Sequence, residues 1–231
     1  MRILTLLLVP LLSQLCIGHL AAQKLTVGAT GATGTSRIIA DDNSSLPTKQ
    51  RFPISGNAGI TVEWKLGAES SLGMEALWVP IRSSEILENF EFVLSPVESI
   101  FITEEYWRHF NYVGIPVYHR LALGKIGIKT GFQAMWLVNG HFTSESIVTR
   151  AGLTTEDGYR DDNTDHLDQF DYGPKLGLDY AILPELRVRA DFYYGLNDLL
   201  NNIGVFKFKN RQLTAGISYR LPLKRKAPAQ Q

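Results

Sequence analysis

Apolar and polar residues alternate with a period of two along most of the chain after residue 24. In the last segment of this kind the apolar positions are Leu213, Ala215, Ile217, Tyr219 and Leu221, and the residues between them are Gln212, Thr214, Gly216, Ser218 and Arg220. Successive side chains of a β-strand point to opposite faces, so this pattern predicts strands with one apolar and one polar face. Eight such strands are expected, near residues 24–32, 56–66, 70–82, 110–123, 125–139, 169–182, 185–197 and 210–221.

The connections between these strands alternate between short and long. Three are very short, at residues 67–69, at Gly124 and at residues 183–184, and four are long, at residues 33–55, 83–109, 140–168 and 198–209. An outer-membrane barrel has short turns at its periplasmic end and longer loops at its outer end. The chain is therefore predicted to be all-β, an eight-stranded antiparallel up-and-down transmembrane β-barrel with both termini on the periplasmic side.

Period-two alternation by itself fits a soluble calycin-like barrel as well as a membrane barrel, because the two differ only in which face meets the solvent. Aromatic residues near the strand ends favour the membrane, as in interface girdles: Trp64, Trp78, Trp136, Tyr172, Tyr180, Tyr194 and Tyr219. The polar face also carries charges of both signs. Glycines are frequent on that same face, at positions 28, 73, 114, 127, 131, 173, 177, 195 and 216.

The charged residues of the polar face are predicted to point into the lumen of the barrel. They are Glu63, Glu75, Arg120, Lys129, Lys175, Asp179, Arg187, Arg189, Asp191 and Arg220. A narrow barrel buries such charges, and buried charges must pair to offset the cost of removing them from water. A structural plug of salt bridges is the expected role of this cluster, and a narrow ion path through rearranged pairs is the alternative.

The N-terminal residues 1–22 have the composition of a secretory signal peptide. Arg2 supplies a positive charge, residues 3–12 are almost wholly apolar, and Ala21 and Ala22 offer small residues for cleavage. The chain is therefore expected to be exported through a cleaved signal peptide to the outer membrane.

Cleavage after Ala22 leaves a barrel domain at residues 23–223 and a periplasmic tail at residues 224–231. It also removes Cys16, the only cysteine, so the mature chain is expected to have no disulfides. No apolar run of a length that spans a bilayer as a helix follows the signal.

The last predicted strand resembles the C-terminal signal that the barrel-assembly machinery reads. Thr214, Gly216, Tyr219 and Leu221 follow its polar, glycine, aromatic and apolar spacing, although an aromatic residue is usual where Leu221 stands. The expected partners are therefore this machinery during insertion and the lipid of the outer membrane.

The long connection 83–109 is unusually rich in apolar residues for a solvated loop. It contains Phe90, Phe92, Phe101, Tyr106 and Trp107. Either the flanking strands extend past the membrane as a hairpin, or the segment exposes an apolar patch that docks an envelope protein. The residues alone leave both interpretations open.

The remaining composition argues against other partners and cofactors. Lysine plus arginine and aspartate plus glutamate are equal, at 23 each, and this balance argues against nucleic acid as the main partner. Asp161, Asn163 and Asp165 have the first spacings of a calcium loop, but His166 and Tyr172 stand where that loop needs glycine and glutamate. No metal or cofactor is therefore expected.

Residues that could support hydrolysis occur near the outer rim: His141, Thr143, Ser144, Glu145 and Ser146. A serine nucleophile needs a base that holds it and a third group that orients the base. A polar loop contains this mixture by chance, so no catalysis is expected.

Four stretches of the chain resemble the PorT-like outer-membrane β-barrel family of Bacteroidota. They are residues 114–121 (GIPVYHRL), 171–180 (DYGPKLGLDY), 194–198 (YGLND) and 216–219 (GISY). The resemblance covers nearly the whole chain after the signal, with Arg120 where the family usually has a lumenal lysine. It implies a barrel without a common catalytic set and, for some members, a role in type IX secretion and gliding.

The function expected from these observations is that of a non-catalytic outer-membrane barrel that anchors, presents extracellular loops or takes part in an envelope assembly such as a secretion machine. The alternatives are a narrow ion or small-solute channel and a lipid-modifying barrel enzyme.

Overall fold

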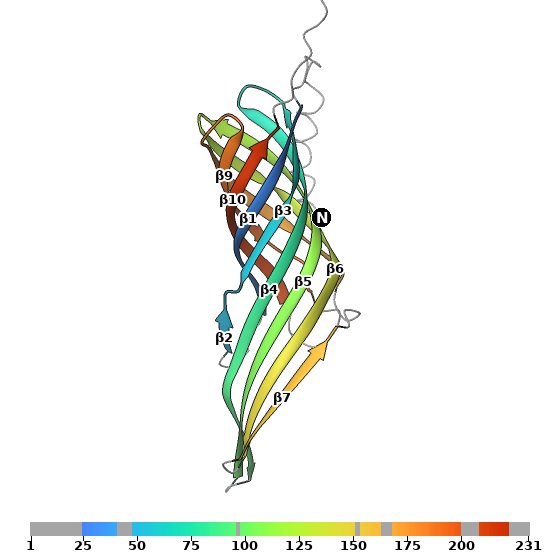
Figure 1. The fold of residues 1–231 in the computed structure, drawn as a ribbon, viewed down its shortest axis with the longest axis vertical. Helices are drawn as coiled ribbons and strands as arrows, with labels where there is room; N and C mark the ends of the chain where they lie inside the picture. Colours follow the sequence, from blue (N-terminus) through green and yellow to red (C-terminus); the bar gives the residue numbers. More distant parts are fainter. Residues whose placement is uncertain are drawn as a thin grey trace, which may run out of the picture.

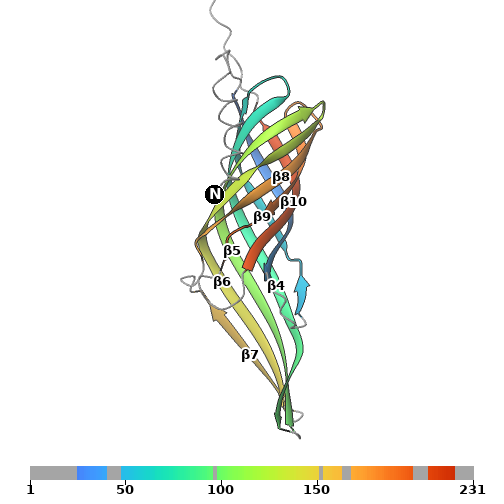
Figure 2. The same cartoon turned by 180° about the vertical axis from the view of Figure 1, so that it is seen from behind.

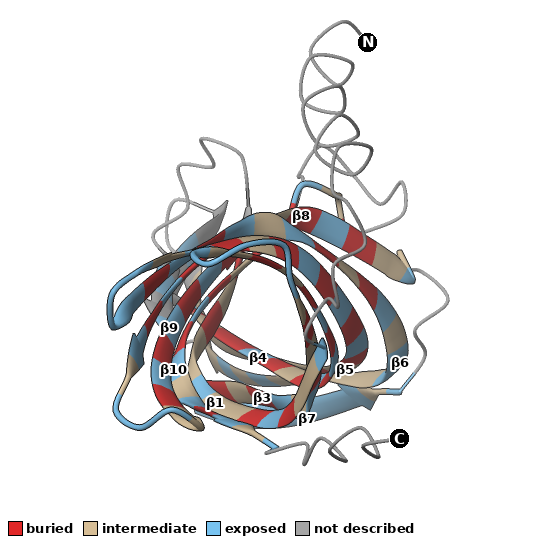
Figure 3. Cartoon of the chain, turned by 90° about the horizontal axis from the view of Figure 1, so that it is seen from above, coloured by how far each residue is buried: buried red, intermediate tan, exposed pale blue. Residues whose placement is uncertain are grey.

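The computed structural model describes residues 25–40, 48–95, 98–150, 153–162, 168–199 and 208–221. Eight strands form a closed antiparallel ring in the order β1 (Leu25–Ala40), β3 (Ile54–Lys65), β4 (Ser70–Ser95), β5 (Glu98–Leu123), β6 (Ile126–Arg150), β8 (Phe170–Ala181), β9 (Leu186–Tyr194) and β10 (Phe208–Arg220). Figure 3 shows this ring from above.

The ring closes where β1 pairs with β10, from Gly28 opposite Arg220 to Ala40 opposite Phe208. Each of the other ring strands pairs with its neighbour along the chain, which is the up-and-down arrangement. The predicted fold class is therefore confirmed. In the part of the chain that the structure describes, no helix has the length and apolar character needed to cross a bilayer.

Short turns join the strands at one end of the barrel. They are residues 66–69, residues 124–125 and residues 182–185. Gly124 has a φ of 62°, a left-handed conformation that glycine adopts without steric cost. These turns coincide with the short connections predicted from the sequence, and by the same rule this end is the one expected to face the periplasm.

At the opposite end, three ring strands run much further than the sequence pattern predicts. The β4–β5 ladder continues from Ser83 opposite Arg108 to Ser95 opposite Glu98, so residues 83–95 and 98–109 form the two paired strands of a hairpin and not a loop. The hairpin interpretation of this segment is confirmed. From Ser83 to Ser95 the strand rises by about 40 Å.

Two shorter strands widen this projection. β7 (Leu153–Asp161) pairs with β6, and β2 (Thr48–Arg51) pairs with β4. We call this projecting structure the outer sheet: residues 83–95 of β4, 98–109 of β5 and 140–150 of β6, together with β2 and β7. Figures 1 and 2 show it continuing beyond the barrel from opposite sides.

The predicted long connections 33–55 and 140–168 are therefore partly wrong, because β1 continues to Ala40 and residues 140–150 and 153–161 are strand. The physical reason is that a strand beyond the bilayer has no face that must meet lipid. The alternation of apolar and polar residues then fades, although the ladder of backbone hydrogen bonds continues.

Within the barrel, burial alternates residue by residue along each strand, as the stripes in Figure 3 show. The outward side chains are apolar and exposed; Phe132, Leu176 and Leu213 are 57%, 54% and 57% exposed. The inward side chains are mostly polar and buried. An apolar outer wall of this kind requires an apolar solvent, which is the arrangement of a membrane barrel.

The outer half of the lumen contains a cluster of apolar side chains, which the sequence pattern did not indicate. Its buried side chains form one cluster: Ile38, Leu77, Val79, Ile81, Phe110, Tyr112, Met135, Tyr193 and Leu199. We call this cluster the apolar layer. It lies further from the periplasmic turns than the charged residues, since Leu77 and Val79 follow Glu75 along β4.

Close packing inside the barrel gives a first prediction, at Gly73. The ring of Tyr118 lies against Gly73, and a Cβ added there would come within 2.3 Å of the ring. Tyr118 is held by hydrogen-bond contacts with Thr61 and Glu63 and cannot easily move aside. Gly73→Ala is therefore expected to lower the free energy of unfolding by about 1–3 kcal/mol.

The matched control for this prediction is Gly31→Ala, because a Cβ at Gly31 has no neighbour within 4 Å. Urea unfolding in detergent, followed by heat-modifiable gel mobility, measures both variants. Equal losses of stability in the two variants would contradict the packing of Tyr118 on Gly73.

Candidate functional site

All ten charges predicted to face the lumen lie on inward positions of the ring strands. Nine of them are buried: Glu63, Glu75, Arg120, Lys129, Lys175, Asp179, Arg187, Arg189 and Asp191. Arg220, near the periplasmic end of β10, is half-buried. They come from every ring strand except β1, so the barrel gathers residues that are far apart in sequence. We call these ten residues the charged layer.

Glu75 is the centre of the charged layer. Its two carboxylate oxygens accept hydrogen bonds of 2.9 and 3.0 Å from Arg189, which reaches across from β9. The ammonium groups of Lys175 and Lys129 lie 3.8 and 4.0 Å from the same carboxylate. One glutamate is thus shared by three cations, and Arg189 also pairs with Asp191 at 2.5 Å.

Asp179 forms a second centre on β8. Arg120 donates two hydrogen bonds to it, of 2.8 and 2.7 Å, in the bidentate geometry that gives the strongest arginine–carboxylate pairs. Arg187 lies 3.7 Å from the same carboxylate. Arg187 also lies 3.4 Å from Glu63, so it joins the second centre to a third.

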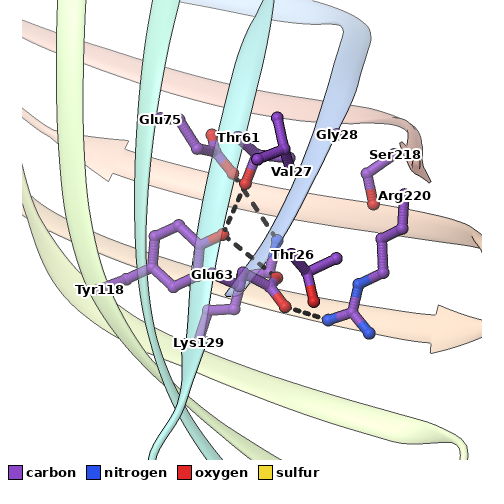
Figure 4. A pocket seen from close by; sticks show the side chains of 10 residues that line it. All are labelled: Thr26, Val27, Gly28, Thr61, Glu63, Glu75, Tyr118, Lys129, Ser218 and Arg220. Carbon is purple, nitrogen blue, oxygen red and sulfur yellow. Dashed lines mark hydrogen bonds and ion pairs between the residues drawn. The ribbon is translucent and has the colours of Figure 1, made fainter. Parts of the chain in front are cut away.

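Glu63 is the third centre, nearest the periplasmic turns. It pairs with Arg220 and lies 3.4 Å from the hydroxyl of Tyr118. Figure 4 shows these side chains around a small pocket. The pocket is lined by Thr26, Val27, Gly28, Thr61, Glu63, Glu75, Tyr118, Lys129, Ser218 and Arg220.

Neutral groups complete the charged layer. The amide oxygen of Gln133 accepts a hydrogen bond of 3.0 Å from Lys175, and the hydroxyl of Thr30 accepts one of 2.6 Å from Arg189. Glycine makes room for the largest groups: a Cβ at Gly127 would lie 2.3 Å from the guanidinium of Arg120. The glycines on the polar face therefore have a steric role.

Asp171 is a lumenal acid that the predicted cluster did not include. It is 0% exposed and lies beside the apolar layer, where the side-chain amide of Asn210 approaches it at 3.3 Å. A Cβ at Gly195 would lie 2.8 Å from its oxygens. Its position on β8, in phase with Lys175 and Asp179, is the signal that could have identified it.

The two layers leave little room for water inside the barrel. A water-filled pore exposes the side chains that line it, but Glu75, Arg189 and Met135 are 2%, 4% and 0% exposed. Every member of the charged layer has an oppositely charged group within 4.0 Å. The arrangement is suited to closing and bracing the barrel.

Three residues of the expected assembly signal lie on β10, and the fourth, Leu221, directly follows it. Thr214 is buried in the lumen, Gly216 approaches Ala32 of β1, and Tyr219 and Leu221 face outward, 45% and 49% exposed. Recognition by the assembly machinery remains a prediction.

The residues considered for hydrolysis do not gather on one face of β6. His141, Thr143 and Glu145 alternate with Ser144 and Ser146, so the serines point to the opposite face. His141 instead stacks on His109, with ring centroids 4.6 Å apart. Burial, followed by the charge of His141, lowers the pKa of His109.

The acidic segment considered for calcium is only partly described. Asp161 ends β7, while Asn163, Asp165 and His166 lie outside the described residues. In the described part of the chain, no group of three histidine, cysteine, aspartate or glutamate residues could hold a metal ion.

Comparison with protein families matches the sequence to a known group. The model of the outer membrane protein beta-barrel domain matches residues 21–201. The chain belongs to this family. As a member of the outer-membrane barrel family, it lies in the outer membrane, and its apolar outer wall faces the lipid of that membrane. No curated protein matches the chain.

The chain is also similar to solved outer-membrane proteins, at low sequence identity. Ail, the attachment invasion locus protein of Yersinia pestis, is 10% identical with a TM-score of 0.39, over 85% of this chain and 98% of Ail. The outer membrane protease OmpT of Escherichia coli is 12% identical with a TM-score of 0.47, over 85% and 97%. Neisserial surface protein A is 12% identical with a TM-score of 0.37, over 85% and 97%.

The charged layer of this outer-membrane barrel gives a second prediction. Glu75→Gln removes the one anion shared by Arg189, Lys175 and Lys129. Leaving buried cations without their partner is expected to lower the free energy of unfolding by about 3–5 kcal/mol. Urea unfolding in detergent measures the loss.

The control for this variant is Glu69→Gln, in the exposed periplasmic turn. It is expected to change stability by less than about 0.5 kcal/mol. A Glu75→Gln variant as stable as this control would show that the lumen hydrates its charges.

Proposed function

We propose that this protein is a closed outer-membrane scaffold that holds the outer sheet above the membrane for interaction with an envelope or extracellular protein. The observation that supports this most strongly is the contrast between the two ends of the molecule. The lumen is filled by paired charges and apolar side chains, whereas three of its strands continue far beyond the barrel.

The filled lumen favours a scaffold over a channel. Ion conduction needs binding sites that ions enter and leave, connected by water or by groups that replace it. Here each cation of the charged layer already lies within 4.0 Å of a carboxylate, and the apolar layer lies on the outer side of the charged layer. Opening a path requires breaking several buried ion pairs at once.

The outer sheet has properties of a binding surface. Phe101 on β5 and Ile147 on β6 are 44% and 43% exposed. Phe101 pairs with Thr149, two residues from Ile147, so the two apolar side chains lie diagonally on one face. Exposed apolar neighbours on a paired sheet are typical of protein interaction sites.

Ion pairs stiffen the sheet that carries this surface. Arg108 on β5 lies 3.3 Å from Glu85 on β4, and Arg51 on β2 lies 2.9 Å from Glu105 on β5. A surface held in one conformation binds a partner with less loss of conformational entropy than a flexible loop does.

The proposal also includes a more specific family, a route of export and a route of insertion into the membrane. The four PorT-like stretches support a member of that family, with a role in a secretion or other envelope assembly. Export by a cleaved signal peptide at residues 1–22 and insertion by the machinery that reads Thr214, Gly216, Tyr219 and Leu221 are parts of the same proposal, and no catalysis is assigned to the barrel.

Planar-bilayer recording tests the closed lumen. The wild-type protein is expected to insert without steady conductance, because the buried ion pairs leave no hydrated path. Steady conductance in the wild type that changes in Arg120→Ala or Glu75→Ala would support the channel instead.

Site-specific photo-crosslinking in the native envelope tests the outer sheet. A crosslinking amino acid at Phe101 or Ile147 is expected to capture one defined protein, because both side chains are exposed on the same face. The control position is Leu176 on the lipid-facing wall. Loss of the captured protein in a Phe101→Ser, Ile147→Ser double variant completes the test, whereas the same products from all three positions would contradict it.

A further inference from the structure

The strand β7 forms an open edge of the outer sheet. In the described part of the chain it pairs with β6 and with no other strand, and Figure 1 shows it at the margin of the sheet. Its residues from Leu153 to Arg160 are all exposed, with Leu153 and Tyr159 at 76% and 59%. An open strand edge carries a row of unpaired backbone N–H and C=O groups, which makes it a template for pairing with another strand.

The sequence of β7 leaves this edge able to pair. Proteins often protect an open edge with a proline or a β-bulge, and β7 has neither. Its residues are LTTEDGYRD, and its register with β6 is unbroken from Phe142 opposite Asp161 to Arg150 opposite Leu153. Charge also protects edges, and β7 carries charges of both signs. The positions of these charges therefore decide which strand fits the edge.

Two contacts show which residues of β7 turn their backbone groups to the open edge. The N–H of Gly158 donates a hydrogen bond of 2.9 Å to the carboxylate of Asp157, so it is not used in the ladder with β6. The hydroxyls of Thr154 and of Thr149, directly opposite on β6, lie 3.2 Å apart, which indicates the closer, non-hydrogen-bonded type of antiparallel pair. Both backbone groups of a strand residue point to the same side, and the side alternates along the strand. The residues with backbone groups at the open edge are therefore Thr154, Glu156, Gly158 and Arg160.

The charges around Gly158 make this edge complementary to a second copy of itself. When two β7 strands pair antiparallel about a two-fold axis at Gly158, each Gly158 faces its own copy, and Glu156 faces Arg160 of the second copy. The symmetry forms this ion pair twice. Opposite charges at directly opposite positions stabilise an antiparallel pair of strands.

The neighbouring two-fold registers are unfavourable. Centring the axis on Glu156, Asp157 or Arg160 places that residue opposite its own copy, so like charges meet. Centring it on Tyr159 places Glu156 opposite Asp162 of the second copy, again with like charges. Like charges directly opposite one another destabilise a sheet. The distribution of charge on β7 therefore favours the register at Gly158 over those next to it.

We propose that the protein pairs with a second copy of itself through β7, in the antiparallel register centred on Gly158, and that the two copies lie in opposing membranes. In such a pair the two-fold axis is perpendicular to the sheet. Figures 1 and 2 show the outer sheet continuing the barrel wall along the long direction of the molecule, and this wall stands along the membrane normal. The axis therefore lies in the membrane plane, and the rotation points the second barrel the opposite way.

The height of Gly158 above the membrane leaves room for this arrangement. Gly158 is opposite Glu145 on β6, and Trp136 is an exposed aromatic residue at the outer end of the lipid-facing wall on the same strand. From Trp136 to Glu145 the strand rises by about 30 Å, or about 22 Å along the membrane normal for the usual strand tilt. From Glu105, opposite Glu145, to the start of β5 the sheet rises only about 17 Å along the normal. The tip of one copy therefore stops short of the other membrane.

Pairing through β7 gives the outer sheet a second role, the attachment of one outer membrane to another. It uses the edge of the sheet, whereas the proposed partner protein binds the face that carries Phe101 and Ile147, so neither proposal depends on the other. A single pair of nine-residue strands is a weak contact. Many copies in two facing membranes act together, because each pair that forms raises the effective concentration of the next.

Clustering of lipid vesicles tests the ion pairs by charge reversal. The full protein is reconstituted into two vesicle populations with different dyes, and energy transfer between the dyes measures clustering. Wild-type vesicles are expected to cluster. Vesicles with Glu156→Arg alone, or with Arg160→Glu alone, are expected to stay dispersed, because each variant opposes like charges across the two-fold axis. Mixing the two variant populations is expected to restore clustering, since each charge then meets its opposite.

Recovery in the mixture separates strand pairing from a general effect of charge or of folding. The matched control is Glu69→Arg in the exposed periplasmic turn, which is expected to cluster as the wild type does. Wild-type clustering by either single variant, or a mixture that stays dispersed, would overturn the proposal. Dispersed wild-type vesicles that instead bind an added envelope protein along β7 would overturn the choice of a second copy as the partner.

Disulfide formation tests the register and the orientation. Cys16 is the only native cysteine, so Gly158→Cys and Thr154→Cys are each made together with Cys16→Ser. Directly opposite residues of a hydrogen-bonded antiparallel pair have Cα atoms about 5.5 Å apart, which a disulfide can bridge. A Cβ at Gly158 meets no atom within 4 Å, so this substitution leaves β7 undisturbed.

The Gly158→Cys variant is expected to form disulfide dimers between differently tagged copies in separate vesicles. The Thr154→Cys variant is expected to form none, because in this register Thr154 faces Asp162 of the second copy. Equal dimer formation at both positions would overturn the register, and dimers confined to copies within one vesicle population would overturn the pairing between opposing membranes.

Discussion

Charged side chains enclosed in a barrel too narrow to hydrate them must neutralise one another, and much of the structure depends on this constraint. Glu75, Asp179 and Glu63 each collect cations from strands on other sides of the ring. The glycines beside them keep the space that these long side chains need. Because the charges come from seven of the eight ring strands, they meet only when those strands are in register, and their pairing favours the closed ring as well as filling it.

Much of this architecture could be predicted from the sequence, because a strand has a strict period of two. The parity of Glu75, Lys129 and Arg189 relative to their apolar neighbours places them on the inward face before any partner is known. The short turns could also be located, since a tight connection between strands leaves a glycine such as Gly124 at the turn. The number of strands followed from these two signals together.

Other features could not be predicted from the same signals. The ion pair of Glu75 with Arg189 joins residues 114 positions apart, and the alternation pattern does not show which inward charges meet across the lumen. The apolar layer was missed because Leu77 and Val79 lie on a stretch of β4 that is apolar on both faces.

A double-mutant cycle on Arg120 and Asp179 measures the central constraint most directly. The two single variants Arg120→Gln and Asp179→Asn and the double variant are unfolded in urea under identical conditions, and the coupling free energy is taken from the four stabilities. Buried, directly paired charges predict a favourable coupling of about 1–3 kcal/mol. A coupling below about 0.5 kcal/mol would mean that the lumen hydrates these groups independently, and it would contradict a barrel closed by its own charges.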